Sequence, residues 1–207
     1  MKYFETLPKI IYNNPITNTP IILTNLLVRS SIINSILNNP LLFYQYDIQE
    51  GDTPEIVAHK YYGDQYRYWM VLFCNQKLDP QWDWPLNSNE FNAYLLNKYP
   101  SINIYNTVYQ YQKVISQFDS NTLTTTENVV EIDQMTYYSI PESQVETYTL
   151  PTGPVTITTT RNVLSIYDYE FNLNESKRSI KLLNQKYAGE LEKELQKLMS
   201  QIGRAHV

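Results

Sequence analysis

Residues 46–99 read YDIQEGDTPEIVAHKYYGDQYRYWMVLFCNQKLDPQWDWPLNSNEFNAYLLNKY, and this stretch decides the fold of the chain. Its beginning predicts a short strand at residues 46–48, which a Gly-Asp turn closes. Thr53 can then cap a helix, and Pro54 suits the first helical position, where its missing N–H costs nothing. We expect that helix to end at Gly63 in a left-handed conformation.

A second short helix follows, with one apolar side. The apolar residues recur at the spacing of a buried helical stripe, namely Tyr66, Trp69, Met70, Phe73 and Cys74. We expect Asn75 to end this helix in a left-handed conformation. Asn87 and Glu90 have the spacing of a capping box for a further helix, which ends before Pro100. A strand, two helices and a return segment therefore predict a compact module over residues 44–100.

The same stretch carries a series of short motifs in a fixed order. They are Gly51-Asp52-Thr53-Pro54-Glu55, His59-Lys60-Tyr61-Tyr62-Gly63-Asp64, Tyr68-Trp69, Asn75, Asp79-Pro80, Asp83-Trp84-Pro85-Leu86 and Phe91…Tyr94…Lys98-Tyr99. The first part of the series resembles a LysM module. The whole series resembles the LysM-like baseplate wedge protein 53 family of T-even-type contractile-tailed bacteriophages.

This resemblance implies a structural subunit of a phage tail baseplate wedge that joins neighbouring wedges around the hub during assembly. Its partners would be other baseplate wedge proteins and the neighbouring wedges. It would lie in the baseplate of the virion after assembly in the host cytoplasm, and it would be neither an enzyme nor the carrier of a cofactor. The alternative is a peptidoglycan-binding LysM protein or the targeting domain of a lysin, and peptidoglycan is an expected partner only in that case.

Charge and hydropathy narrow the classes of partner. The formal net charge is −5, so the bulk electrostatics do not suggest a nucleic-acid partner. No apolar run approaches the roughly 18–20 residues that span a bilayer, and the first residues lack the apolar core of a signal peptide. Neither nucleic acid nor membrane is an expected partner. Cys74, the single cysteine, is expected to be a small buried hydrophobe in a reducing compartment.

The sequence has few of the residue types that commonly act in catalysis or bind metals. The chain has two histidines, His59 and His206, so a nucleophilic triad would have to use His59, which we expect at the surface. His59 and Cys74 alone cannot make a zinc site, which needs three or four ligands. Asp79, Asp83 and Glu90 could supply the paired carboxylates of a glycosidase, but the pattern favours a turn with an aromatic anchor. The sequence predicts no catalytic, metal or cofactor site.

The remaining segments complete an α+β fold. Residues 1–43 predict an N-terminal arm with strands at residues 9–12 and 20–23 and a short helix within residues 25–37. Alternating apolar and polar residues predict a β-rich region over residues 101–173, at 102–115, 129–140, 145–150, 155–160 and 163–171. A hairpin loop is expected at residues 151–154.

The end of the chain predicts a C-terminal helix over residues 174–201. Its apolar stripe would consist of Ile180, Leu183, Tyr187, Leu191, Leu195 and Leu198. Residues 202–207 resemble the translation of a sequencing adapter, and we interpret them as an artefact. Residues 101–173 carry Lys113 and Arg161 against eight acids, so the β-rich region is acidic.

All three tryptophans fall within the module, and three roles are open to them. They could form a sugar-stacking platform, anchor the core and its loops, or contact a partner protein. Trp69 lies on the helical stripe and favours the core. Trp82 and Trp84 lie in a loop and are the candidate partner contacts, together with Ile10, Ile11 and Tyr12 of the N-terminal arm.

Overall fold

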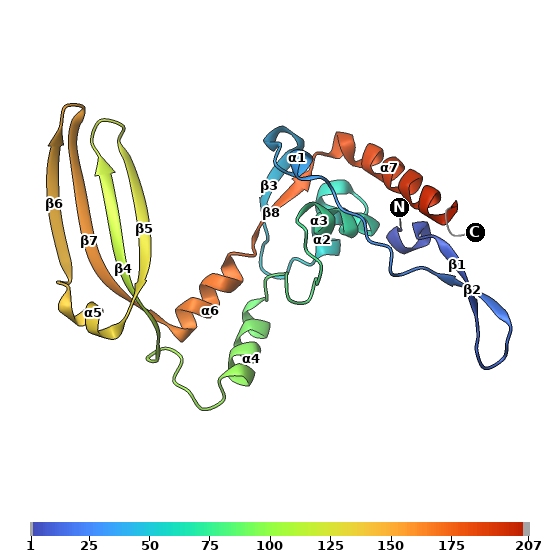
Figure 1. Ribbon diagram of the computed structural model, residues 1–207, viewed down its shortest axis with the longest axis horizontal. Helices are drawn as coiled ribbons and strands as arrows, with labels where there is room; N and C mark the ends of the chain where they lie inside the picture. The colour runs from blue at the N-terminus through green and yellow to red at the C-terminus, as the bar shows by residue number, and fades with distance from the viewer. Residues whose placement is uncertain (1, 205–207) are drawn as a thin grey trace. The chain divides into compact units, whose positions relative to one another are not determined.

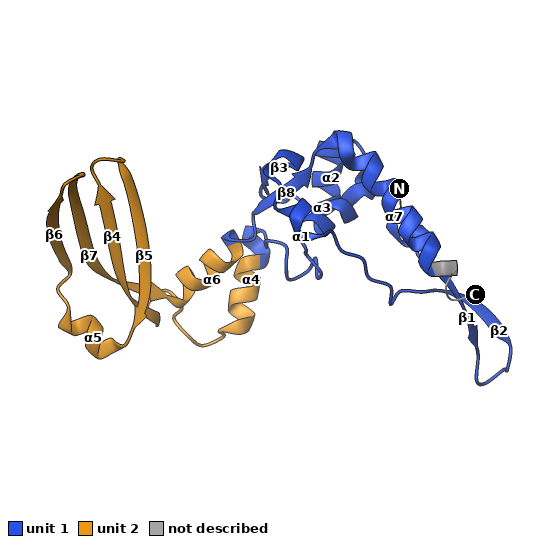
Figure 2. Cartoon of the chain, turned by 45° about the horizontal axis from the view of Figure 1, so that its top comes forward, with its two compact units in different colours: residues 1–90, 175–207 blue, residues 91–174 orange. Residues whose placement is uncertain are grey.

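The chain of the computed structural model divides into two units, and the structure describes residues 2–204. Unit 1 comprises residues 1–90 and 175–207, and unit 2 comprises residues 91–174, as Figure 2 shows. Unit 2 is thus an insertion within the sequence of unit 1. The mixture of helices and strands confirms the α+β class. His206 and the end of the adapter-like tail lie outside the described residues.

The core of unit 1 is built on a two-stranded sheet. Strand β3 (Phe43–Asp47) pairs antiparallel with β8 (Ser179–Leu183), as Figure 1 shows. Helix α2 (Pro54–Tyr62), the 3-10 turn η3 (Gln65–Arg67) and helix α3 (Tyr68–Cys74) follow β3 in the chain. Side chains of α2, α3 and β8 form one apolar cluster, which includes Val57, Ala58, Trp69, Met70, Val71, Ile180 and Leu182.

The helix boundaries of this core follow the local signals in the sequence. The Thr53 side chain accepts a hydrogen bond from the Ile56 amide at 3.4 Å, and Pro54 occupies the first turn. Gly63 ends α2 with φ +70°, a conformation that glycine adopts without steric cost. The predicted cap and stop are both confirmed.

Asn75 ends α3, but the prediction of a left-handed Asn75 is wrong. Its φ is −102°, and the positive φ of 53° belongs to Gln76. The Asn75 side chain instead forms hydrogen bonds with the main chain. Its amide group donates to the carbonyl of Val71 at 2.7 Å and to the carbonyl of Lys181 at 2.8 Å, and its oxygen accepts from the Lys181 amide at 2.8 Å. Asn75 therefore ties the end of α3 to strand β8.

The prediction of one helix over residues 174–201 is wrong. Residues 179–183 form β8, and the C-terminal helix α7 (Gln185–Arg204) begins after it. Ile180 and Leu182 are 1% and 0% exposed, which is the alternation of a strand with one buried face. The packing of these side chains and the pairing with β3 outweigh the helical spacing of Ile180 and Leu183.

Unit 2 contains a four-stranded antiparallel sheet in the order β5-β4-β7-β6. Its strands are β4 (Val108–Asp119), β5 (Thr124–Ile132), β6 (Ser143–Leu150) and β7 (Gly153–Ser165). Leu150 pairs with Gly153 across the β6–β7 turn, which confirms the predicted hairpin.

Three helices accompany this sheet in the sequence: α4 (Ser88–Lys98), α5 (Gln134–Ser139) and α6 (Ile166–Glu175). The capping box that begins α4 is confirmed, since the Glu90 amide donates to Asn87 at 2.9 Å and the Asn87 amide donates to Glu90 at 3.3 Å. The predicted strand at 163–171 is wrong beyond Ser165. The Ser165 hydroxyl accepts from the Asp168 amide at 3.1 Å and caps α6.

The N-terminal arm forms a hairpin of β1 (Lys9–Asn13) and β2 (Pro20–Thr24), which confirms both predicted strands. Of the helix expected within residues 25–37, the structure forms one turn, α1 (Asn34–Leu37). Two serines and several β-branched residues weaken the remainder as a helix. Short 3-10 turns η1 (Tyr3–Thr6) and η2 (Pro40–Leu42) complete the described elements.

Leu182 distinguishes the strand from the helix that we predicted there, because the helical stripe leaves this residue out. We expect Leu182→Ala to lower the free energy of unfolding of unit 1 by about 2–5 kcal/mol, since it deletes a fully buried side chain. Leu198→Ala, at an exposed position of α7, is the matched control and should cost less than about 1 kcal/mol. Denaturant unfolding of both variants measures this, and equal losses would contradict the strand.

Candidate functional site

A buried carboxylate, Asp52, joins three parts of unit 1. One carboxylate oxygen accepts from Lys60 Nζ of α2 at 2.6 Å. The other accepts from the Tyr46 hydroxyl of β3 at 2.7 Å and from the Gln49 amide at 3.2 Å. The main-chain carbonyl of Asp52 accepts from the Trp84 indole at 2.7 Å. Strand β3, helix α2 and the loop after α3 are therefore all hydrogen-bonded to the turn that contains Asp52.

The protonation states of this cluster follow from its hydrogen bonds. Burial alone would raise the pKa of Asp52, but the hydrogen bonds from Lys60, Tyr46 and the Gln49 amide lower it below its ordinary value. Burial and the hydrogen bond to Asp52 raise the pKa of Tyr46 to about 12. At neutral pH Asp52 is charged and Tyr46 keeps its proton, so the carboxylate accepts a hydrogen bond from each of Lys60, Tyr46 and the Gln49 amide.

The three tryptophans differ in accessibility. Trp69 and Trp84 are 4% and 7% exposed, whereas Trp82 is 57% exposed. The predicted core role of Trp69 agrees with this burial. The candidate contact Trp84 is buried: its ring packs inside unit 1, and its indole N–H donates to the main-chain carbonyl of Asp52. The described tryptophans do not share one exposed face, which does not favour the sugar-stacking platform, one of the three roles left open by the sequence.

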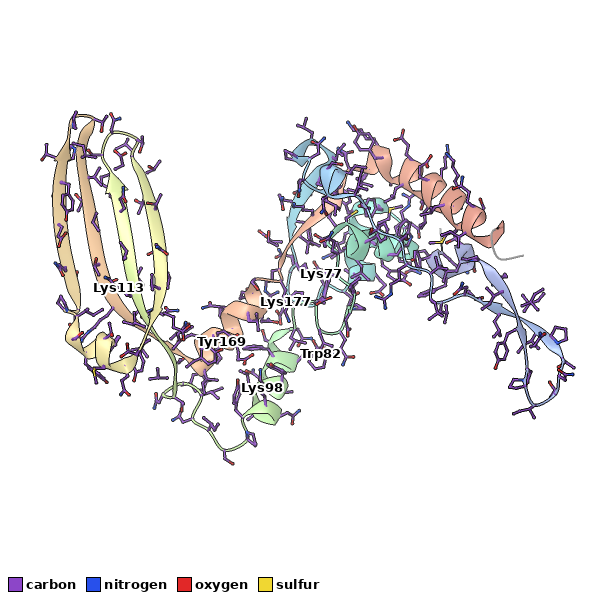
Figure 3. All side chains as sticks on the ribbon, in the orientation of Figure 1. Lys77, Trp82, Lys98, Lys113, Tyr169 and Lys177 are labelled. Carbon is purple, nitrogen blue, oxygen red and sulfur yellow. The ribbon has the colours of Figure 1, made fainter. Side chains whose placement is uncertain are left out.

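The loop that presents Trp82 is held by its own hydrogen bonds. One Asp83 carboxylate oxygen accepts from the amides of Leu78 and Asp79, each at 3.0 Å. Lys177 donates to the Trp82 carbonyl at 2.7 Å, and Lys77 donates to the Asp83 carbonyl. Figure 3 labels Lys77, Lys177 and Trp82 around this loop. The exposed Trp82 ring is thus carried by a fixed backbone, which is what a contact residue needs to bind without a large ordering cost.

The β1–β2 hairpin carries the other predicted contacts. Ile11 is 71% exposed, and Ile22, its cross-strand partner, is 75% exposed. Tyr12 is also exposed, whereas Ile10 is half-buried. A two-stranded hairpin with exposed isoleucines on one side is marginal in water without a partner surface. The structure thus brings Ile11 and Ile22 together; Trp82 lies in a separate loop.

The sheet of unit 2 is an exposed surface that we did not predict as a site. Its strands include exposed apolar side chains, among them Val129, Val145, Tyr148 and Leu150. An antiparallel sheet of this kind is stable when one face is covered. The alternating pattern indicated the strands, but it could not indicate how many layers they form. The many threonines in these strands could have indicated that neither face of the sheet is deeply buried.

A second buried carboxylate organises the helices of unit 2. Glu170 of α6 accepts from Lys98 Nζ at 2.8 Å, from the Tyr99 hydroxyl at 2.7 Å and from the Tyr94 hydroxyl at 3.1 Å. Burial would raise the pKa of Glu170, but the hydrogen bonds from Lys98 and Tyr99 lower it. All three donors come from α4 or the residue after it, so this cluster fastens α4 to α6.

Neither buried carboxylate has the surroundings of a catalytic acid, since lysine and tyrosine donors keep both charged. His59 is exposed on α2. Burial raises the pKa of the Cys74 thiol to about 12, so the nucleophilic thiolate is not populated at neutral pH. Within residues 2–204, no three His, Cys, Asp or Glu side chains gather as metal ligands. In the described part of the chain, no helix has the length and hydropathy to cross a bilayer.

Comparison with known proteins gives one family. A family model described as base plate wedge protein 53 matches residues 5–198. The match covers nearly the whole of both units and confirms the resemblance that the motif series indicated. No curated protein matches the chain significantly.

The Asp52 cluster predicts a pH dependence of stability. Because the pKa of Asp52 is lowered on folding from about 3.9, its hydrogen bonds stabilise unit 1 above about pH 4 and are lost as the pH falls through the folded pKa. We expect Asp52→Asn to cost about 2 kcal/mol at neutral pH and less in acid.

The measurement is thermal unfolding of the wild type and the variant between about pH 7 and pH 2. Asp47→Asn, an exposed acid in β3, is the matched control and should behave as the wild type. A constant difference between Asp52→Asn and the wild type at every pH would show that the charge of Asp52 does not stabilise the fold.

Proposed function

The chain belongs to the base plate wedge protein 53 family, and on this premise we propose that it joins neighbouring wedges around the hub of a phage tail baseplate. Membership of this family indicates a structural role in the baseplate of the virion. The joining of wedges, and assembly in the host cytoplasm, are our proposals. The observation that carries them is the match over residues 5–198, which takes in both units rather than one motif.

We propose further that the core of unit 1 is LysM-like. The order β3, α2, α3, β8 is strand, helix, helix, strand, and the two strands pair antiparallel. In this proposal the return strand comes from residues 179–183 rather than from residues 44–100. The module is then completed only after the whole of unit 2 has been synthesised.

The proposed mechanism is adhesion through exposed apolar side chains on a rigid frame. Trp82 is exposed on a loop that hydrogen bonds hold, and Ile11 and Ile22 are exposed on the paired strands of the hairpin. Aromatic anchors of this kind supply much of the binding free energy at protein interfaces. In a ring of identical wedges each contact is repeated, so modest interfaces add up to a closed assembly. Other wedge proteins are the partners that we propose.

No observation favours peptidoglycan as a ligand, because the three tryptophans do not present one exposed aromatic face on which a sugar could stack. The proposed function is tested by adding the purified chain to wedges that lack this subunit. Electron microscopy should show separate wedges before the addition and closed rings after it. Wedges that close without the chain, or stay separate with it, would contradict the joining role.

Trp82 provides the sharper test of how the rings close. We expect Trp82→Ala to fold normally by circular dichroism, because the ring is mostly exposed, and to reduce ring closure strongly. Truncation of one hot-spot residue costs about 2 kcal/mol or more at each interface. Leu41→Ala, which also removes an exposed apolar side chain, is the matched control and should close rings normally. Normal rings with Trp82→Ala would remove Trp82 from the interface.

A further inference from the structure

Unit 1 contains an apolar groove between the segment of residues 28–32 and helix α3. Its volume is about 830 Å³, and its lining is mostly apolar and aromatic. Among the lining residues are Val28, Ile32, Trp69, Leu72 and Phe73. A cavity of this size accommodates a ligand as large as a few amino acid residues. None of the interactions that we assign to wedge joining uses it.

Two hydrogen-bond donors in the lining of this groove have no acceptor among residues 2–204. The indole Nε1 of Trp69 and the hydroxyl of Ser30 are both buried, and neither forms a hydrogen bond with a residue that the structure describes. Trp69 is 4% exposed, so bulk water does not solvate its ring. Buried polar groups in native proteins almost always have partners, and an unmatched donor is costly. The two donors indicate a ligand that brings hydrogen-bond acceptors.

The charge of the groove indicates the kind of acceptor. Arg29 and Lys77 line it, and no Asp or Glu does among the described residues. Lys77 donates to the main-chain carbonyl of Asp83. Arg29 is exposed and makes no hydrogen bond or ion pair with the described residues. A guanidinium beside an apolar floor is suited to a carboxylate, which it can bind through two parallel hydrogen bonds.

We propose that this groove binds an extended segment of a partner protein that carries a carboxylate side chain among apolar side chains. The carboxylate pairs with Arg29, and the apolar side chains cover the half-buried Leu72 and Phe73. Main-chain carbonyls of the segment accept from the Trp69 indole and the Ser30 hydroxyl. A neutral sugar would leave the charge of Arg29 without a counter-charge. The choice of a protein segment over a small metabolite rests on the proposed structural role in the baseplate.

The test uses two synthetic peptides, Ac-Leu-Phe-Asp-Leu-NH₂ and Ac-Leu-Phe-Asn-Leu-NH₂, which differ in one carboxylate. Each is titrated into the full-length chain labelled with ¹⁵N, and the indole proton of Trp69 is observed by NMR. Trp82→Phe and Trp84→Phe assign the other two indole signals. We expect the aspartate peptide to move the Trp69 signal downfield and to bind about tenfold more tightly than the asparagine peptide.

Arg29→Gln should reduce this preference to below about threefold, because it removes the charge that distinguishes the two peptides. Lys193→Gln, an exposed position on α7, is the matched control and should keep the full preference. Equal affinities for the two peptides, an unmoved Trp69 signal, or the same loss in both variants would overturn the proposal. A saturable shift with an N-acetylglucosamine tetramer instead of the peptides would also overturn it.

The peptide titration needs no wedges, and the ring-closure assay needs no peptide. A groove that fails to select the carboxylate therefore overturns this inference and leaves the joining role to its own test. If the groove selects the carboxylate but the chain fails to close rings, the joining role is overturned and the groove proposal stands.

Discussion

The buried carboxylate of Asp52 is the interaction on which the arrangement of unit 1 depends. Its oxygens accept hydrogen bonds from Tyr46 of β3, from Lys60 of α2 and from the Gln49 amide of the connecting turn. A buried charge is tolerated only when its hydrogen bonds are complete, so the positions of these donors are tightly constrained. The bond from Trp84 to the carbonyl of the same residue extends the constraint to the loop that carries the exposed Trp82. In unit 2 Glu170 uses the same chemistry, with one lysine and two tyrosines, to fasten α4 to α6.

The second constraint is the closure of unit 1 across the insertion. The side-chain amide of Asn75 donates a hydrogen bond to the Lys181 carbonyl of β8 and accepts one from the Lys181 amide. Glu50 accepts from the Ser88 amide at 2.6 Å and from Arg178 at 3.5 Å, so it links the chain just before and just after unit 2. The site where the chain leaves unit 1 is therefore also the site where it returns. This allows a separate sheet to be inserted without opening the core, and the core can serve as a rigid frame for the exposed contacts.

Local signals in the sequence predicted local structure well. Thr53, Gly63 and the Asn87–Glu90 box act through residues within one turn, and each forms the expected contact. Strand β8 was missed because Ile180 and Leu183 have helical spacing, and the choice was made by pairing with β3, far away in the sequence. Trp82 and Trp84 lie two residues apart in one loop, and the burial of Trp84 depends on its packing and on its hydrogen bond to Asp52, 32 residues earlier in the chain. The groove beside α3 could not be predicted, because it forms where residues 28–32 lie against Trp69 and Phe73.

We infer that β3, α2, α3 and β8 form one folding unit that does not need the inserted unit 2. The most direct measurement is amide hydrogen exchange on a chain in which residues 91–174 are replaced by a short Gly/Ser linker. We expect the amides of β3 and β8, including Tyr46 and Ile180, to keep the strong protection of the full chain, since the residues on both sides of the insertion meet at Glu50. Rapid exchange of the β8 amides in the shortened chain, with α2 and α3 still protected, would contradict it.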